Sequence, residues 1–222
     1  MPEASRTAEK IFRGNPVSAG VCRGKILVLN RTRPAIVRLT VPDSNLAEEI
    51  NRLEKALIKT RQQIIEVQRK ISEGMGAKGV GIFDAHLLVL EDRTLLDEVA
   101  RVIQEDKVNA EYAFHSVAER YATSLAAVED EYLRERATDM RDVIGRVLNN
   151  LLGRDDDLDL RRLKEPCIII SHDLTPSNTA QLDKRNVLGF ATDVGSKTSH
   201  TAIMARSLRI PAIVGLKDAS SQ

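Results

Sequence analysis

The spacing of apolar residues divides the chain into a region of short strands, a long helical region and a second region of strands. Residues 25–30 and 35–41 are short, rich in β-branched residues and bounded by Gly and Pro, which predicts strands. Residues 45–152 contain no proline and predict helices almost throughout. After residue 153, buried strands are predicted at 165–171, 186–193 and 210–215, with a short helix at 198–208.

The first predicted helix carries a continuous apolar seam. Its positions alternate steps of four and three residues over nearly four heptads, at Leu46, Ile50, Leu53, Leu57, Thr60, Ile64, Val67 and Ile71. A seam of this kind lies along another helix at a shallow angle. Further helical stretches begin near Ile82 and bend near 92–94, begin again after Asn109, and cover roughly 130–152. Short connections between them predict an up-and-down four-helix bundle.

The predicted fold class is therefore α/β plus all-α. Strands alternating with a short helix after residue 153 are typical of a compact α/β unit. We expect the strand-rich segments at both ends to form one discontinuous α/β domain, residues 1–42 and 153–222. The helical bundle, residues 43–152, is predicted to be inserted between them.

The amino-acid composition argues against nucleic-acid binding, a membrane span, secretion and a disulfide framework. The 222 residues include 33 Lys and Arg and 32 Asp and Glu, and a net charge of +1 does not suit a general nucleic-acid binder. Hydrophobic residues at 42% and charged residues at 29% are ordinary for a soluble globular protein. No apolar run predicts a membrane span, and residues 1–10 do not resemble a secretory signal. Two cysteines predict neither a disulfide framework nor a metal site, so we expect a reduced, cytoplasmic protein.

The most informative stretch for chemistry is residues 193–206 (DVGSKTSHTAIMAR). A strand ends, a turn at Gly195 follows, and Thr198 or Ser199 can cap a new helix, which places His200 in its first turn. Unpaired N–H groups and the positive macrodipole there disfavour an imidazolium, so His200 is predicted to be neutral and nucleophilic near pH 7. A phosphoryl group brought to it would meet ready donors. The alternative is a histidine that merely packs or caps.

A Gly-Ser-Lys-Thr sequence at 195–198 shares part of the phosphate-binding P-loop pattern. The P-loop requires Gly immediately before Lys and a second Gly at a fixed spacing upstream. Here Ser196 precedes Lys197, and Gly189 stands at the wrong spacing, so nucleotide binding through this loop is not predicted. Lys197 remains a candidate for positive charge beside a phosphoryl group.

A second candidate segment, residues 173–177, follows the buried strand at 165–171, where sites of α/β proteins tend to form. Thr175 could hydrogen-bond one nitrogen of His200 and so fix which nitrogen reacts. Thr175 or Ser177 could equally cap the next helix, and both roles are compatible. His172 lies at the same strand end, either with a direct role or simply exposed.

A run of four apolar residues at 87–90 follows His86. Such a run covers all sides of a helix, so some of these side chains must point away from the bundle seam. They indicate either a surface for a partner or a bend whose two faces are both covered.

Several of these segments resemble those of a known enzyme family. Residues 198–215 (TSHTAIMARSLRIPAIVG) closely resemble the phosphohistidine signature of phosphoenolpyruvate-utilising enzymes. Residues 82–92 (IFDAHLLVLED) and 130–153 (DEYLRERATDMRDVIGRVLNNLLG) resemble the helical domain of enzyme I of the bacterial phosphotransferase system. Residues 171–182 resemble the segment before the signature in that enzyme. The signature alone would also suit pyruvate phosphate dikinase or phosphoenolpyruvate synthase, but the helical segments are specific to enzyme I.

The resemblance implies roles for individual residues. His200 would be phosphorylated on Nε2, and Thr175 would hydrogen-bond it. The phosphoryl group would also be stabilised by Gly195, Lys197, Thr198 and Ser199, although the family often has Gly-Gly-Arg where this chain has Gly195-Ser196-Lys197. The bundle would dock the histidine-containing phosphocarrier protein of sugar uptake through a surface formed by His86, Leu88, Val89, Asp92 and Arg136.

The family continues for several hundred residues into a (β/α)8 barrel that binds phosphoenolpyruvate and Mg²⁺ and dimerises. The resemblance therefore predicts a monomeric N-terminal fragment, without a cofactor of its own, that cannot use phosphoenolpyruvate alone. Its α/β domain would swivel between barrel and carrier, and the full-length enzyme would be a homodimer. Three alternatives stay open: the mobile domain of a dikinase, a module that docks the carrier but transfers nothing, and a nitrogen-branch regulatory paralogue.

Overall fold

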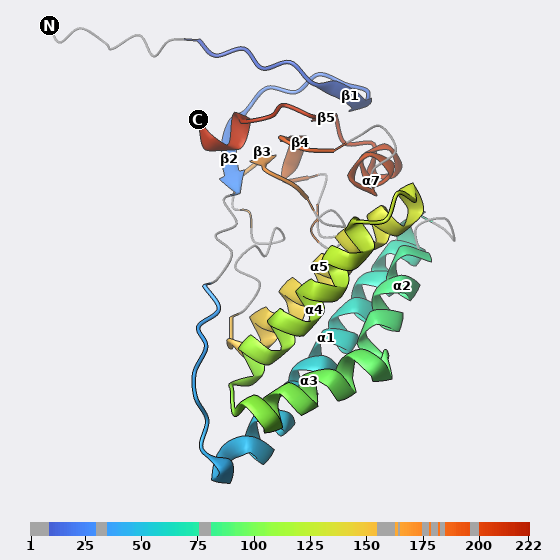
Figure 1. Cartoon of the computed structure of the whole chain (residues 1–222). Coiled ribbons are helices and arrows are strands. Elements are labelled where there is room, and N and C mark those ends of the chain that lie inside the picture. The colour runs from blue at the N-terminus through green and yellow to red at the C-terminus, as the bar shows by residue number, and fades with distance from the viewer. Residues whose placement is uncertain are drawn as a thin grey trace, which may run out of the picture. The chain divides into compact units, whose positions relative to one another are not determined.

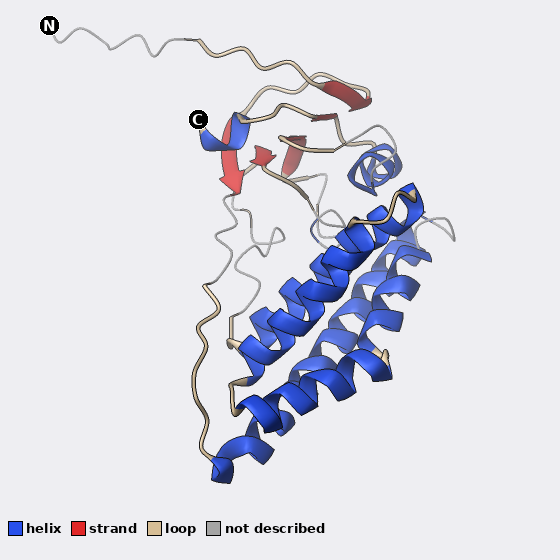
Figure 2. Cartoon of the chain, viewed as in Figure 1, coloured by secondary structure: helices blue, strands red, loops and turns tan. Residues whose placement is uncertain are grey.

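The structure, a computed structural model, describes residues 9–29, 35–75, 81–154, 163, 165–174, 178, 182, 185–195 and 200–222. Its internal contacts divide the chain into two compact units. The α/β unit combines Met1–Arg31 with Leu160–Gln222, and the helical unit is Thr32–Asp159. Figure 1 traces both units along the chain, and Figure 2 shows that the strands lie in the first and the long helices in the second.

The α/β unit is built on a five-stranded sheet with the order β1-β5-β4-β3-β2. Strands β2 to β5 are parallel, and β1 pairs antiparallel with β5 at one edge. Helix α7 connects β4 to β5 and packs against β1 and β5, and a short 3-10 helix, η4, follows. The strands predicted after residue 153 and at 25–30 are confirmed. The elements are β1 (Asn15–Ser18), β2 (Lys25–Leu29), β3 (Cys167–Ser171), β4 (Val187–Thr192), α7 (His200–Leu208), β5 (Ala212–Val214) and η4 (Ala219–Ser221).

The four parallel strands end together. Leu29 pairs with Ser171, Ser171 with Thr192, and Thr192 with Val214, so the last residues of β2, β3, β4 and β5 form one row across the sheet. We call this end of the sheet the carboxyl edge. Parallel α/β sheets place their ligand sites at this edge, because the loops after the strands converge there.

Burial of apolar side chains from both the sheet and α7 holds the α/β unit together. Ile169 and Val214 of the sheet and Met204 of α7 are fully buried. Each such side chain stabilises the fold by roughly 1.5–3 kcal/mol relative to exposure. Gly189 in β4 permits a close approach, since a Cβ atom there would lie 2.5 Å from Cys22 Sγ.

The helical unit contains five helices within its described residues: α1 (Leu46–Met75), α2 (Gly81–Leu90), α3 (Arg93–Asp106), α4 (Ala110–Ala126) and α5 (Glu131–Leu151). The fold class predicted from the sequence is confirmed, but the expected bend near residues 92–94 is a break between two helices. Asp92 causes it by capping α3, where its carboxylate accepts a hydrogen bond from Leu95 N at 3.1 Å. No helix among the described residues combines the length and apolar character needed to cross a membrane.

The heptad seam of α1 is confirmed. Leu53, Thr60, Ile64 and Val67 are buried, and α1 packs along α5. Thr60 fits in this seam because its hydroxyl donates to Ala56 O at 2.7 Å and accepts from Asn150 Nδ2 at 2.8 Å. A buried hydroxyl without such partners would be destabilising.

The strand expected at 35–41 does not join the sheet. Within this segment Thr40 forms a single antiparallel bridge with Val108 of the helical unit. Val41 N donates to Lys107 O at 2.8 Å, and Asn109 N donates to Leu39 O at 3.1 Å. Lys107 ends α3 in a left-handed conformation with φ 51°, so the backbone between α3 and α4 lacks helical partners and pairs with this segment instead.

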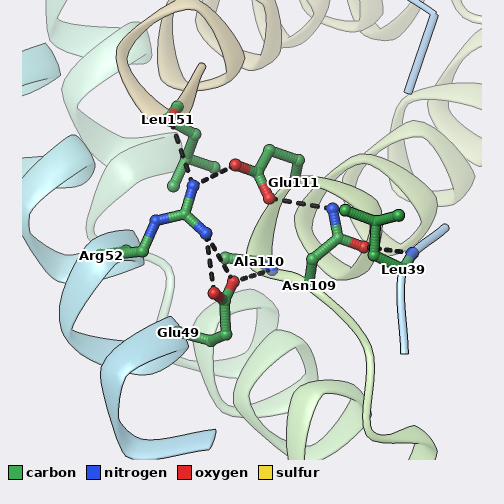
Figure 3. A network of polar contacts seen from close by, with 7 residues as sticks. All are labelled: Leu39, Glu49, Arg52, Asn109, Ala110, Glu111 and Leu151. Carbon is green, nitrogen blue, oxygen red and sulfur yellow. Dashed lines mark hydrogen bonds and ion pairs between the residues drawn. The ribbon is translucent and has the colours of Figure 1, made fainter. Parts of the chain in front are cut away.

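A charged cluster fixes the same end of the helical unit (Figure 3). The Arg52 guanidinium donates to both carboxylate oxygens of Glu49, to Glu111 and to Leu151 O. Glu111 also accepts from Asn109 Nδ2 at 2.9 Å, while Asn109 Oδ1 accepts from Leu39 N at 2.9 Å. These contacts join α1, α4, the C-terminal end of α5 and the segment before α1.

Candidate functional site

The loop that leaves β4 continues alongside the end of β3. Asp193 N donates to Ser171 O and Val194 N donates to His172 O, both at 3.1 Å. Gly195 then has φ 120°, a conformation that favours glycine because other residues carry a Cβ. The chain therefore turns toward α7 immediately after the carboxyl edge, with Gly195 at the turn.

The segment after β5 borders this loop on its other side. Leu216 N donates to Thr192 O at 3.1 Å, and Lys217 N donates to Asp193 O at 3.0 Å. The loop between β4 and α7 thus has backbone hydrogen bonds to both neighbouring segments of the carboxyl edge.

Asp193 places a buried carboxylate at this junction. Its Oδ1 accepts from Ser220 N at 3.0 Å, its Oδ2 accepts from Ser220 Oγ, and Oδ2 lies 3.4 Å from His172 Nδ1. Burial acts to raise the pKa of Asp193, but the two hydrogen bonds from Ser220 and the neighbouring His172 together outweigh it. The pKa of Asp193 therefore lies below its ordinary value, and the group is a carboxylate at neutral pH.

Helix α7 is described from His200 to Leu208, within the helix that the sequence predicts at 198–208. Thr201, the residue after His200, is buried, and its hydroxyl donates to Leu174 O at 2.7 Å. This bond holds the first turn of α7 against the residue that precedes Thr175. Thr175 follows Leu174 in the chain and His200 precedes Thr201, so this hydrogen bond joins the immediate sequence neighbours of the two predicted site residues. The first-turn N–H groups of α7 lack intrahelical partners and favour an anion.

Several predicted site residues are not described. Thr175, Lys197, Thr198 and Ser199 lie outside the described residues, as does the side chain of His200. Their roles stay predictions. Gly189 lies inside β4, which places it in the sheet and not in a phosphate-binding loop.

The residues predicted for a docking surface lie on α2 and α5 and at the junction between α2 and α3. Leu88 is 69% exposed, Val89 is half-buried and Asp92 is exposed at the N-terminus of α3. Arg136 on α5 is partly exposed, and its Nη1 lies 3.3 Å from Asp139 Oδ2. The run at 87–90 does present an apolar side chain to solvent, as its composition indicates.

His86 is not a surface residue, which corrects the expectation that it contributes directly to docking. Its side chain is 0% exposed, packed edge-on to Phe83 with ring centroids 5.5 Å apart. Its Nε2 lies 3.7 Å from Asp139 Oδ1, and neither ring nitrogen has a hydrogen-bond partner among the residues that the structure describes. Phe83, His86 and Leu90 share the buried face of α2 because they follow helical spacing.

Two family models match almost the whole chain. Residues 13–136 match the N-terminal model of PEP-utilising enzymes, and residues 163–222 match the mobile domain of PEP-utilising enzymes. The chain belongs to the PEP-utilising enzymes.

Relatives within the PEP-utilising enzymes narrow the comparison to enzyme I. The chain is 42% identical over 96% of its length to the phosphoenolpyruvate-protein phosphotransferase of Geobacillus stearothermophilus, and 39% identical over 94% to that of Bacillus subtilis. It spans 36% of the length of each of these relatives. The resemblance to the N-terminal region of enzyme I is thereby confirmed.

Solved structures agree with this assignment. A solution NMR structure of an enzyme I protein called nEIt is 41% identical, with a TM-score of 0.76, and the match covers 96% of this chain and 85% of that one. An N-terminal domain of Enzyme 1 - Nitrogen is 25% identical, with a TM-score of 0.65, and the match covers 95% and 86% respectively.

Sequence reasoning missed three contacts of the site. Asp193 stands just before the predicted turn, which is a signal for a role at the strand end, but its partner Ser220 lies 27 residues away without any local mark. Thr201 had no separate prediction. Asp139, between His86 and Arg136, follows Arg136 by one helical turn and was detectable only as an i,i+3 pair.

Proposed function

We propose that this chain is the N-terminal part of a phosphoenolpyruvate-protein phosphotransferase, in which His200 carries the phosphoryl group. The observation that supports it most is the position of His200 as the first residue of α7, beside the carboxyl edge, in a segment that matches the mobile-domain model. Thr201, bonded to Leu174 O, holds that first turn in place.

The proposed step is an exchange between two histidines. The lone pair of His200 Nε2 attacks the phosphorus of a phosphohistidine on the carrier, a P–N bond to His200 forms, and the P–N bond to the carrier breaks. One phosphoramidate replaces another, so the exchange is close to balanced and reversible. Positioning and charge stabilisation then supply most of the catalysis.

The residues around His200 have separate proposed tasks. Thr175 accepts a hydrogen bond from Nδ1–H of His200 and so holds the tautomer that leaves the Nε2 lone pair free to react. First-turn N–H groups of α7 and the hydroxyls of Thr198 and Ser199 would bind phosphoryl oxygens. Lys197 would add positive charge, and Gly195 permits the turn.

The helical unit is the proposed docking site for the histidine-containing phosphocarrier protein. Exposed Leu88 offers an apolar contact, and Arg136 offers a cation. Asp92 and Val89 lie close to Leu88 along the chain. We also propose that the α/β unit moves as a body between the carrier and the phosphoenolpyruvate site, a hinge motion for which two compact units are suited.

Phosphoenolpyruvate and Mg²⁺ are proposed to bind the part of the full-length protein that this chain does not span. Among the described residues, no group of three or more His, Cys, Asp or Glu is placed to hold a metal ion. We propose that the chain itself is monomeric and cytoplasmic and that the full-length protein is a homodimer.

The test uses the phosphorylated carrier mixed with the full chain, followed by intact-mass measurement at neutral pH. The wild-type chain should gain one phosphoryl group, and His200→Ala should gain none. Calorimetric titration with the unphosphorylated carrier measures docking separately. Binding without transfer in the wild type would contradict the proposed function and favour a docking module.

A further inference from the structure

One carboxylate joins three segments of the carboxyl edge. Asp193 follows β4, Ser220 lies in η4 after β5, and His172 follows β3. The Asp193 side chain accepts two hydrogen bonds from Ser220 and lies 3.4 Å from His172 Nδ1. Its exposed fraction is 4%, so water does not replace these contacts.

A buried carboxylate is costly unless donors surround it, which makes its presence here informative. The backbone of the loop already bonds to β3 and to Lys217 through Asp193 N and Asp193 O. The side chain adds a different connection, from the end of β4 to η4. Since Asp193 stands two residues before Gly195, this connection restrains the entry to the turn that leads to His200.

We propose that Asp193 is a positioning residue for phosphoryl transfer, and that its bonds to Ser220 form a latch that sets the orientation of the loop before His200. This inference rests on the proposed function of His200. With the latch intact, the turn at Gly195 and the first turn of α7 keep one arrangement relative to the carboxyl edge. Without it, residues 193–195 sample more arrangements, and His200 spends less time in the geometry that reacts.

The experiment measures single-turnover transfer from excess phosphorylated carrier to the full chain and to three variants. Here kcat denotes the maximal rate constant at saturating carrier, and KM denotes the carrier concentration that gives half of that rate. Asp193→Asn removes the charge and one of the acceptors that Ser220 uses. We expect kcat to fall roughly tenfold to a hundredfold, the scale of a misplaced reacting group. KM should stay within twofold of the wild type, because the proposed docking surface lies on the helical unit.

Ser220→Ala provides a second variant that keeps the backbone N–H of Ser220 bonded to Asp193. We expect a smaller fall in kcat, severalfold, again with KM unchanged. Asp218→Asn is the matched control: Asp218 is an exposed carboxylate two residues from Ser220, and its replacement should leave kcat and KM unchanged.

Hydrogen exchange of β4 separates positioning from folding. Rates are compared at a temperature where exchange shows that each variant is folded, so a purely structural role would leave kcat unchanged. Wild-type kcat in folded Asp193→Asn overturns the inference. If Asp193→Asn does not fold, Ser220→Ala decides: a wild-type kcat overturns the inference and a reduced kcat supports it. Failure of the wild-type chain to accept a phosphoryl group would instead overturn the proposed function.

Discussion

Replacing Arg52 by Met should destabilise the helical unit through the carboxylate that it leaves behind. Arg52 bonds to Glu49 and Glu111, whose side chains are 12% and 9% exposed, while its own side chain is 36% exposed. After the replacement, Glu111 keeps the Asn109 amide at 2.9 Å but loses its charged partner. The destabilisation comes from two largely buried carboxylates, Glu49 and Glu111, that are no longer paired with a cation.

The expected magnitude follows from that burial. Breaking a fully buried ion pair costs about 3–5 kcal/mol, whereas an exposed pair is worth about 0–1 kcal/mol. Because Arg52 is partly open to water and Glu111 keeps one hydrogen bond, we expect the free energy of unfolding to fall by about 2 kcal/mol. With an m-value of about 2 kcal/mol per molar urea, the midpoint would fall by about 1 M.

Urea unfolding followed by far-ultraviolet circular dichroism is the assay, since the long helices dominate that signal. Arg101→Met is the matched control: Arg101 is 59% exposed and pairs with Glu98 and Glu105 on the surface, so the midpoint should barely move. The double variant Arg52→Met with Glu111→Met removes the more buried of the two carboxylates that lose Arg52. Glu49 keeps the hydrogen bond from Ala110 N at 2.8 Å, so we expect about half of the loss to be recovered. A single-variant shift no larger than that of Arg101→Met would refute the reasoning, as would a double variant that shows no recovery.

Three further predictions concern single groups. The lowered pKa of Asp193 contributes stability that is present above its ordinary pKa near 4 and is lost as the pH falls through the lower folded value. Hydrogen exchange of β4 should therefore differ between wild type and Asp193→Asn at pH 6, and the difference should shrink as the pH falls below 4; a constant difference would contradict it. Asp139→Asn should weaken carrier binding severalfold in calorimetry, because it releases Arg136. If Asp139 acts through Arg136, the same replacement should not weaken carrier binding further in a chain that already carries Arg136→Ala. Burial raises the pKa of the Cys167 thiol, so an alkylating reagent should label the partly exposed Cys22 first, as peptide mass spectrometry would show; equal labelling would argue against it.

Long periodic patterns were the most predictable part of the fold. The seam of α1 is visible because it repeats over many turns, and its buried positions Leu53, Ile64 and Val67 agree with the structure. The segment at 35–41 has the composition of a strand, but composition cannot show which backbone groups elsewhere lack partners. Those groups lie at 107–109, after the left-handed end of α3. Tertiary context therefore decided its pairing.

The candidate site was predictable where its residues are close in sequence. The strand, the turn at Gly195 and the start of α7 at His200 follow one another along the chain, and all three are found. The bond between Asp193 and Ser220 depends on β5 returning beside β4, which no local pattern of charges reveals. His86 was misplaced because a histidine beside an apolar run suits either a surface or a buried face, and only the packing of α2 against α5 decides between them.

The most direct test of the account is to locate the phosphoryl group. Trypsin cleaves after Lys197 and Arg206, which releases residues 198–206 as a peptide whose only histidine is His200. After incubation with the phosphorylated carrier and digestion at neutral to alkaline pH, the account predicts one phosphoryl group on this peptide, lost on brief acid treatment. A phosphoryl group on another peptide, or none in a chain that binds the carrier, would contradict it.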